Sequence, residues 1–197
     1  MSDDLKPWTV LGRRTLLDAS PFLRVHADTV ELPDGRRVED YYQVEQGDFV
    51  IMFVEDEGGR VLMLRQYKYG VRRVSQTFPA GGINGGEEPL AAAKRELLEE
   101  TGYVSDDWTA LGAYAVQANH RGCLCHMFHA RNARKVAEPD SGDLEEMRLE
   151  FLTRAELLEA AAAGDYALLP VVALLGAVLL PALRDGLAKA TGTSKDI

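Results

Sequence analysis

The chain has 197 residues, of which 46% are hydrophobic, and its 22 basic and 31 acidic side chains give a formal net charge of −9 at pH 7. This length fits one domain with an elaboration, and the acidic balance excludes non-specific binding to nucleic acid or to an anionic membrane, because both need a basic surface. The first residues lack the basic and apolar run of a signal peptide, and two cysteines cannot make a disulfide framework. We therefore expect a cytoplasmic protein.

The first part of the chain is predicted to be rich in β-structure. Six alternating or apolar runs indicate strands, at residues 8–17, 22–32, 37–44, 49–54, 61–66 and 75–79. Pro33-Asp34-Gly35 is a turn signal between the second and third runs. The sixth run leads into a glycine-rich loop.

A helix and a mixture of further elements follow the glycine-rich loop. Pro89 suits a first helical turn and Gly102 suits a helix end, so we expect a helix over residues 88–101. Later patterns predict strands at residues 109–117, 124–130 and 148–152, and helices at residues 153–163 and 168–183. The last helix is apolar but shorter than the roughly 20 residues of a membrane span, so we expect it to be buried. Strands flanked by helices indicate an α+β fold.

The helix over residues 88–101 carries a cluster of charged side chains. At about 100° per residue, Glu96, Glu99 and Glu100 share one sector near Arg95, and the leucines of the helix fall on the other side. Clustered carboxylates raise one another's pKa unless a cation lies between them, and hard oxygen ligands favour Mg²⁺, with Mn²⁺ as the alternative. For these residues alone, a solvated acidic helix face is the competing interpretation.

The residues around this cluster follow a longer pattern with fixed spacing. They read G-x5-E-x7-R-E-U-x-E-E-x-G-U, where U is bulky and apolar, starting at Gly81 and passing Glu87 and Arg95. The pattern ends with Gly102 and Tyr103. It resembles the Nudix box of the Nudix hydrolases, and the resemblance implies a Nudix α/β/α sandwich.

Looser similarity outside the box indicates a subfamily. Leu64–Lys68 looks like the RQYR strand of ADP-ribose and nucleoside-diphosphate-sugar pyrophosphatases, and Phe78–Gly82 looks like their LPAG segment. The resemblance implies a Nudix domain over residues 47–190, an N-terminal antiparallel β subdomain over residues 1–46, and a tail over residues 191–197. In that subfamily the N-terminal part helps to form a dimer and covers the substrate, which implies a homodimer here.

The resemblance also implies roles for single residues. Glu96, Glu99 and Glu100 are the expected metal ligands, together with the main-chain carbonyl of Ala80. Arg95 is expected to orient the glutamates, and Arg95 and Glu99 are counted with the catalytic groups.

Three residues outside the box complete the expected site. The acidic loop after the box often supplies the general base in this subfamily, which implies Glu145 first and Glu146 as the alternative; an ordinary solvated loop is the competing interpretation. Arg65 and Arg72 are the expected substrate contacts, because guanidinium groups bind phosphate through paired hydrogen bonds. A solvated strand end would explain these arginines equally well.

The expected activity is Mg²⁺-dependent hydrolysis of the diphosphate bond of a nucleoside diphosphate linked to a sugar or similar group. Divalent ions lower the pKa of the attacking water and neutralise charge on the phosphate oxygens. One alternative is a Nudix pyrophosphatase acting on dinucleotides, coenzyme A or nucleoside triphosphates. A second alternative is a Nudix module that binds a nucleotide without catalysis.

Overall fold

The chain folds into two compact units. A computed structural model describes residues 5–142, 144 and 146–180. Unit 1 comprises Met1–Asp48 and Ala115–Leu124, and unit 2 comprises Phe49–Tyr114 and Cys125–Ile197. The expected domain boundary after residue 46 stays a prediction. The expected tail, and the end of the expected Nudix domain, lie outside the described residues.

Unit 1 is an antiparallel sheet to which a distant segment is added. Its strands are β1 (Thr9–Ala19), β2 (Leu23–Glu31) and β3 (Arg37–Gln46), in that spatial order. The start of β10 (Arg121–Lys135) runs parallel to β3, with Arg121 opposite Val44, and the Val44 N–H donates to the carbonyl of His120 at 2.9 Å. These main-chain bonds hold the start of β10 against the N-terminal sheet, and residues 115–124 belong to the same compact unit.

Unit 2 holds most of the strands and all the described helices. Its strands are β4 (Phe49–Asp56), β5 (Val61–Lys68), β6 (Arg73–Thr77), β7 (Ala80–Gly82), β8 (Tyr103–Val104) and β11 (Met147–Leu152). β9 (Asp107–Gln117) and β10 (Arg121–Lys135) contribute residues to both units. The helices are α1 (Pro89–Thr101), α2 (Arg154–Ala163) and α3 (Leu169–Leu179). β4 pairs with β10 and β7, and β5 pairs with β6 and β11.

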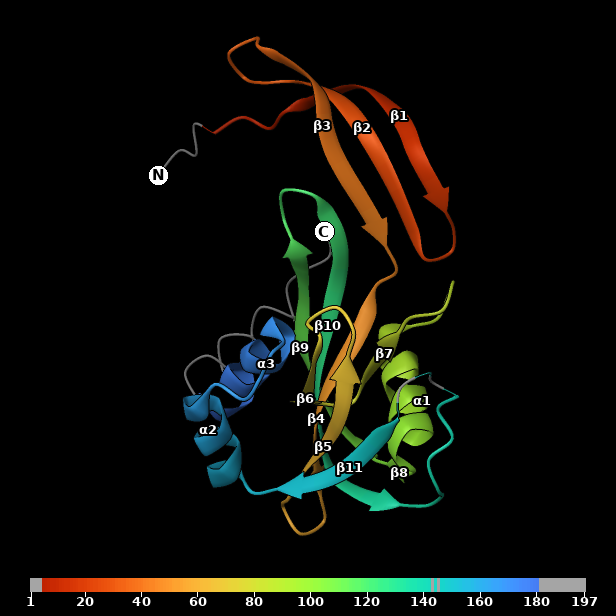
Figure 1. The fold of residues 1–197 in the computed structure, drawn as a ribbon, viewed down its shortest axis with the longest axis vertical. Helices are drawn as coiled ribbons and strands as arrows, with labels where there is room; N and C mark the ends of the chain where they lie inside the picture. The colour runs from red at the N-terminus through yellow and green to blue at the C-terminus, as the bar shows by residue number, and fades with distance from the viewer. Residues whose placement is uncertain (1–4, 143, 145, 181–197) are drawn as a thin grey trace. The chain divides into compact units, whose positions relative to one another are not determined.

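Alternating side chains of β4 form two apolar layers in unit 2. Ile51 and Phe53 belong to a core that includes residues of α2 and α3, whereas Val50, Met52 and Val54 belong to a core that includes residues of α1. Figure 1 shows α1 on one side of these strands and α2 and α3 on the other. Successive residues of a strand point to opposite faces, so a continuous apolar run suits a strand covered on both faces. The predicted α/β/α sandwich is confirmed.

The two C-terminal helices begin as their sequences predict. Thr153 caps α2: its hydroxyl accepts the N–H of Glu156 at 3.2 Å, and the Glu156 carboxylate accepts the Thr153 N–H at 2.7 Å. Pro170 lies in the first turn of α3. In the part of the chain that the structure describes, no helix is long and apolar enough to cross a membrane.

The burial of the side chains of α1 does not follow their polarity alone. Leu97 is fully buried, but Leu90 and Leu98 are 39% and 38% exposed, while Glu100 is only 5% exposed. The buried face of α1 therefore runs through Leu97 and Glu100 rather than through all three leucines. A carboxylate occupies a position that an apolar residue would otherwise fill.

Gly102 ends α1 and touches the segment that returns to it. Its φ of +75° is left-handed, its N–H donates to Leu98, and a Cβ there would overlap the carbonyl oxygen of Ala137. Gly164 ends α2 with a φ of +76°, but a Cβ there would meet open space. We expect Gly102→Ala to lower the free energy of unfolding by about 3 kcal/mol and Gly164→Ala by only about 1 kcal/mol. Backbone strain from the left-handed φ acts at both positions, whereas the new Cβ overlaps a neighbouring atom only at Gly102. Urea unfolding measures both, and equal losses would contradict the argument.

Candidate functional site

Arg95 is the centre of a charged network on α1. Its Nε and Nη2 donate to the two carboxylate oxygens of Glu87, both at 2.9 Å. Nη1 donates to Glu96 at 2.7 Å and to Glu99 at 3.0 Å, and Nη2 also donates to the carbonyl of Gly82 at 2.9 Å. The hydrogen bonds to Glu87 raise the pKa of the Arg95 guanidinium above its ordinary value. The Arg95 guanidinium thus holds two glutamates of α1 in place, together with the loop before the helix.

Glu100 anchors the short strand β7 to α1. Its carboxylate accepts the main-chain N–H of Ala80 at 2.9 Å, and Figure 1 shows β7 alongside the helix. At the next residue, Gly81, a Cβ would overlap the carboxylate of Glu96. Glycine is therefore required for this close approach. Glu96 and Glu100 are both held against the main chain of residues 80–82.

The segment after β10 is tied to the same helix. The N–H of Asp140 donates to the main-chain carbonyl of Glu99 at 2.8 Å. Glu145, the expected base, lies outside the described residues. Glu146, the alternative, is exposed and lines a groove beside β5 and β11. The acidic loop therefore begins at the charged cluster, while the assignment of the base stays a prediction.

The donor groups beside β7 suit a hard divalent cation. Glu96, Glu99 and Glu100 offer carboxylate oxygens and Ala80 offers a carbonyl, which are the ligands that Mg²⁺ and Mn²⁺ prefer. Among the described residues, no three acidic, histidine or cysteine side chains already converge as metal ligands do. Glu96 and Glu99 are bonded to Arg95 instead. The chemistry of the site fits the ion, and binding it requires these carboxylates to turn from their present partners.

A cavity of about 220 Å³ lies beside Ala80. Its polar lining comes from Gln66 and Lys68 at the end of β5 and from Thr77 in β6. The remaining wall is apolar and consists of Phe49, Ile51, Leu168, Pro170 and Val171. Lys68 belongs to the basic stretch of the sequence that also holds Arg65 and Arg72, whereas Gln66 and Thr77 were not expected to contact substrate. Alternation along β5 is a signal for Gln66, because residues 66 and 68 share one face of the strand.

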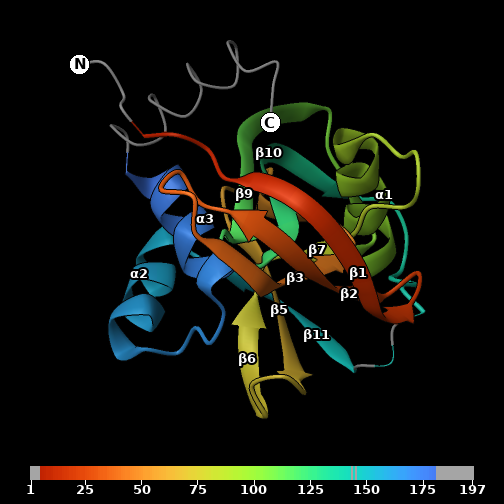
Figure 2. The same cartoon turned by 90° about the horizontal axis from the view of Figure 1, so that it is seen from above.

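The two arginines expected to contact substrate lie elsewhere in unit 2. Arg65 donates to Glu150 at 2.7 Å and points to the face of β5 opposite that of Lys68. Arg72 lies in the β5–β6 turn with a φ of +53°, in the hairpin seen projecting in Figure 2. Neither residue lines the cavity beside Ala80. The structure does not bring them to the charged cluster of α1.

Glu87 gives the network a defined pH dependence. Hydrogen bonds from Arg95 and from the Asn84 N–H lower the pKa of Glu87 from its ordinary value of 4.5 to about 2. A carboxyl group with a lowered folded-state pKa contributes stability above its unfolded pKa and loses it as the pH falls through the folded value. We expect Glu87→Gln to be less stable than the natural protein above pH 4.5, with the difference shrinking toward pH 2. Unfolding curves between pH 2 and 7 test this, and a constant difference would contradict it.

Comparison with protein-family models identifies the class to which the chain belongs. The NUDIX domain model matches residues 46–172. The match covers more than half of the chain and includes the charged helix and β7, so the chain belongs to the Nudix family. A second model, the nucleoside diphosphate sugar hydrolase N-terminal domain, matches residues 8–44, which are most of β1 to β3.

Individual relatives share the same region. The chain is 30% identical over 122 residues to an ADP-ribose pyrophosphatase of Bacillus subtilis (strain 168), covering 62% of this chain and 65% of the relative. It is 33% identical over 132 residues to a CMP-5′-(N-acetyl-N-hydroxy-3-aminopropyl)phosphonate hydrolase of Streptomyces rubellomurinus (strain ATCC 31215), covering 67% and 63%. The chain thus spans slightly less than two thirds of each relative. A crystal structure of an ADP compounds hydrolase matches 98% of this chain and 100% of its own, with a TM-score of 0.75 and 22% identity, which shows a shared fold.

Proposed function

We propose that this protein hydrolyses the diphosphate bond of a nucleoside diphosphate linked to a sugar or similar group, with Mg²⁺ as cofactor. The products would be a nucleoside monophosphate and a sugar phosphate. The observation that carries the proposal is the placement of Glu96 and Glu100 of α1 against the main chain of residues 80–82. Arg95 also holds Glu99 beside Glu96. Mn²⁺ is the alternative ion, with the same oxygen ligands.

The chemistry needs an attacking water and a stabilised leaving group. The water oxygen bonds to one phosphorus, the bond from that phosphorus to the bridging oxygen breaks, and the bridging oxygen leaves with the other phosphate. The bound ion would lower the pKa of the water and neutralise charge on the phosphate oxygens. Glu96, Glu99, Glu100 and the Ala80 carbonyl would hold it, and Glu145 is the proposed acceptor of the water proton.

The cavity beside Ala80 would receive part of the substrate. Lys68 places a positive charge in the same cavity that Ala80 lines, which suits a phosphate group. Gln66 and Thr77 supply hydrogen-bonding groups on an otherwise apolar wall, and such a wall suits a ring. The Bacillus subtilis relative is named for ADP-ribose, which makes ADP-ribose the first substrate to test and other nucleotide sugars the next.

A hydrolysis panel tests the proposal. It compares ADP-ribose, other nucleotide sugars, NADH, coenzyme A and nucleoside triphosphates, each with Mg²⁺ and with EDTA, and measures the nucleoside monophosphate released. Metal-dependent turnover that is fastest with a sugar nucleotide is the expected result. Faster cleavage of dinucleotides, coenzyme A or triphosphates would overturn the substrate class. Binding without cleavage of any compound would favour the non-catalytic alternative.

We also propose that the protein is a homodimer. All 11 residues of β1 are exposed in the single chain, including large apolar side chains at Val10, Leu11, Leu16 and Leu17. Among the described residues, β1 pairs only with β2, so its other edge offers unpaired main-chain groups to a second copy. Light scattering after size exclusion tests this, and a monomer at high concentration would overturn it.

We retain the cytoplasm as the proposed location. The chain has only two cysteines, Cys123 and Cys125, and such low cysteine usage is typical of proteins in a reducing compartment. Fractionation of the cells that make the protein is the direct test. Recovery in a secreted fraction would contradict the proposal.

A further inference from the structure

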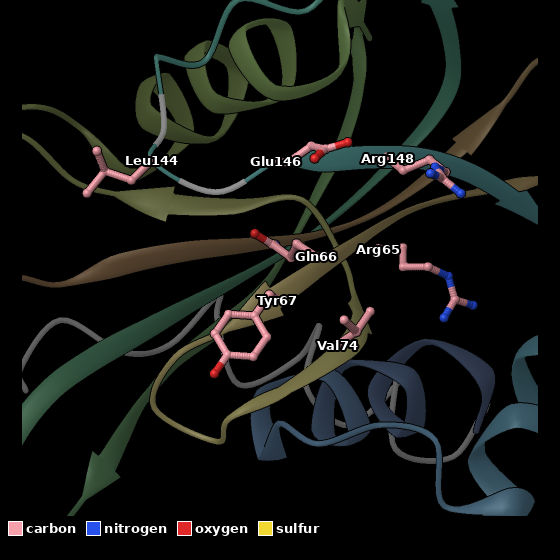
Figure 3. A pocket seen from close by; sticks show the side chains of 7 residues that line it. All are labelled: Arg65, Gln66, Tyr67, Val74, Leu144, Glu146 and Arg148. Carbon is pink, nitrogen blue, oxygen red and sulfur yellow. The ribbon is translucent and has the colours of Figure 1, made fainter.

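A second groove, of about 440 Å³, lies on strands β6, β5 and β11 of unit 2. Figure 3 shows the side chains that line it, which are Arg65, Gln66, Tyr67, Val74, Leu144, Glu146 and Arg148. Its volume is in the range of small-molecule sites. Gln66 borders both cavities, but Lys68 and Ala80 line only the other one. The groove is therefore a neighbour of the candidate active site and contains none of the proposed metal-binding glutamates.

Strand register arranges the groove in two rows. Arg65 lies directly opposite Arg148 on β11, and Tyr67 lies directly opposite Val74 on β6. Glu146 comes just before β11, next to the Tyr67 row. Directly opposed residues of antiparallel strands point to the same face. One row therefore carries two guanidinium groups, and the next carries a ring, an apolar side chain and a carboxylate.

The arginine row has more positive charge than its surroundings balance. Like charges directly opposite each other in a sheet are destabilising. Glu150 binds Arg65 at 2.7 Å and also accepts from Gln76 at 2.6 Å, so this carboxylate is already shared. The Arg148 side chain makes no hydrogen bond or close ion pair with any described residue, and the nearby charge that it acts on is again that of Glu150. A dianionic group such as phosphate would satisfy both guanidinium groups at once.

The second row suits the rest of a nucleotide. Tyr67 and Val74 are 45% and 54% exposed, so an aromatic base has open surface on which to stack. Residues two apart along a strand are separated by about 6.6 Å, which one ribose spans between a phosphate and a base. Glu146 lies in this row, where an ionised carboxylate accepts hydrogen bonds from ribose hydroxyls.

We propose that this groove binds a nucleoside monophosphate, at a site separate from the metal helix. The phosphate bonds to Arg65 and Arg148, the ribose hydroxyls to Glu146, and the base stacks on Tyr67 and Val74. The choice of a nucleoside monophosphate among phosphorylated ring compounds rests on the proposed function, which releases one. Arg65 would therefore bind a phosphate group other than the one proposed to lie beside Lys68.

Calorimetric binding of AMP to the full chain, with EDTA present, tests the groove. Arg148→Ala is expected to weaken AMP binding about tenfold, because one charged pair of hydrogen bonds is lost. Tyr67→Ala is expected to weaken it several-fold and Tyr67→Phe to leave it unchanged. Arg134→Ala is the matched control, since it removes the same charge from an exposed pair with Asp106. Inorganic phosphate serves as a second probe. Among these variants, only Arg148→Ala should weaken the binding of phosphate.

The outcomes separate this proposal from the proposed function. AMP binding that is equal in Arg148→Ala and in the natural protein overturns the groove, whatever the hydrolysis panel shows. Equal weakening of AMP binding in Arg134→Ala and Arg148→Ala also overturns the groove. The net charge of the protein, rather than a contact in the groove, would then be the cause. A loss confined to Arg148→Ala and Tyr67→Ala supports the groove even if no sugar nucleotide is hydrolysed.

Discussion

Glu100→Gln should reduce hydrolysis by about 10³-fold or more while leaving the protein folded. The substitution removes the charge of a proposed metal ligand, and the ion's stabilisation of transition-state charge is worth several kcal/mol, with about 1.4 kcal/mol for each tenfold in rate. The amide keeps the shape of the side chain, and its oxygen can still accept the Ala80 N–H that the carboxylate accepts at 2.9 Å. Initial rates with Mg²⁺ measure the effect.

A matched substitution separates loss of the ligand from loss of charge on the helix. Glu88→Gln removes one negative charge from the exposed N-terminal boundary of α1, outside the cluster. We expect its rate to stay within about threefold of the natural protein, as for most exposed positions. Undiminished turnover in Glu100→Gln would remove Glu100 from the metal site. Equal losses in both variants would show that the general charge of α1 is responsible.

Gly81→Ala should reduce turnover on the order of 10²-fold, because displacement of a catalytic group by about 1 Å has an effect of that size. The new Cβ would overlap the carboxylate of Glu96, which must then move from its place beside Arg95 and the main chain of β7. The carboxylate is the far end of the flexible Glu96 side chain, so it can move aside while the fold is kept. Initial rates and thermal unfolding, measured together, distinguish lost activity from lost stability.

The neighbouring glycine is the control for this experiment. At Gly82 a Cβ would meet nothing within 4 Å, and its carbonyl can still accept from Arg95 after substitution. Gly82→Ala should therefore retain most of the activity. Equal losses of activity in Gly81→Ala and Gly82→Ala would contradict the argument. The loss would then have a cause other than the close approach of Glu96 to Gly81.

The helix and its charged cluster were predictable because their signals are local. Pro89 and Gly102 define the ends of α1 through backbone chemistry, and the predicted start and end lie within one residue of those observed. The 3.6-residue period also brought Arg95 together with Glu96 and Glu99, as the structure has them. The burial of Glu100 was not predictable from the period, because it depends on the Ala80 N–H, 20 residues earlier.

Features that depend on distant pairing were harder to predict. The cavity beside Ala80 combines residues of β5 and β6 with Leu168 and the start of α3, and no sequence spacing relates them. Arg65 was recognised as a cation, but its direction depends on which face of β5 it occupies and on its register with Glu150. The sequence gives the charge of a strand residue such as Arg65, whereas strand register determines which side chains it contacts.

The return of residues 115–124 to the N-terminal sheet affects how the Nudix part can be isolated. A deletion that starts the chain at Asp48 would leave the tip of the β9–β10 hairpin without the β3 groups that it binds, including the Val44 N–H and the Gln43 amide that donates to Asn119. A stable minimal fragment therefore needs two changes, removal of the first 47 residues and replacement of the hairpin tip by a short turn.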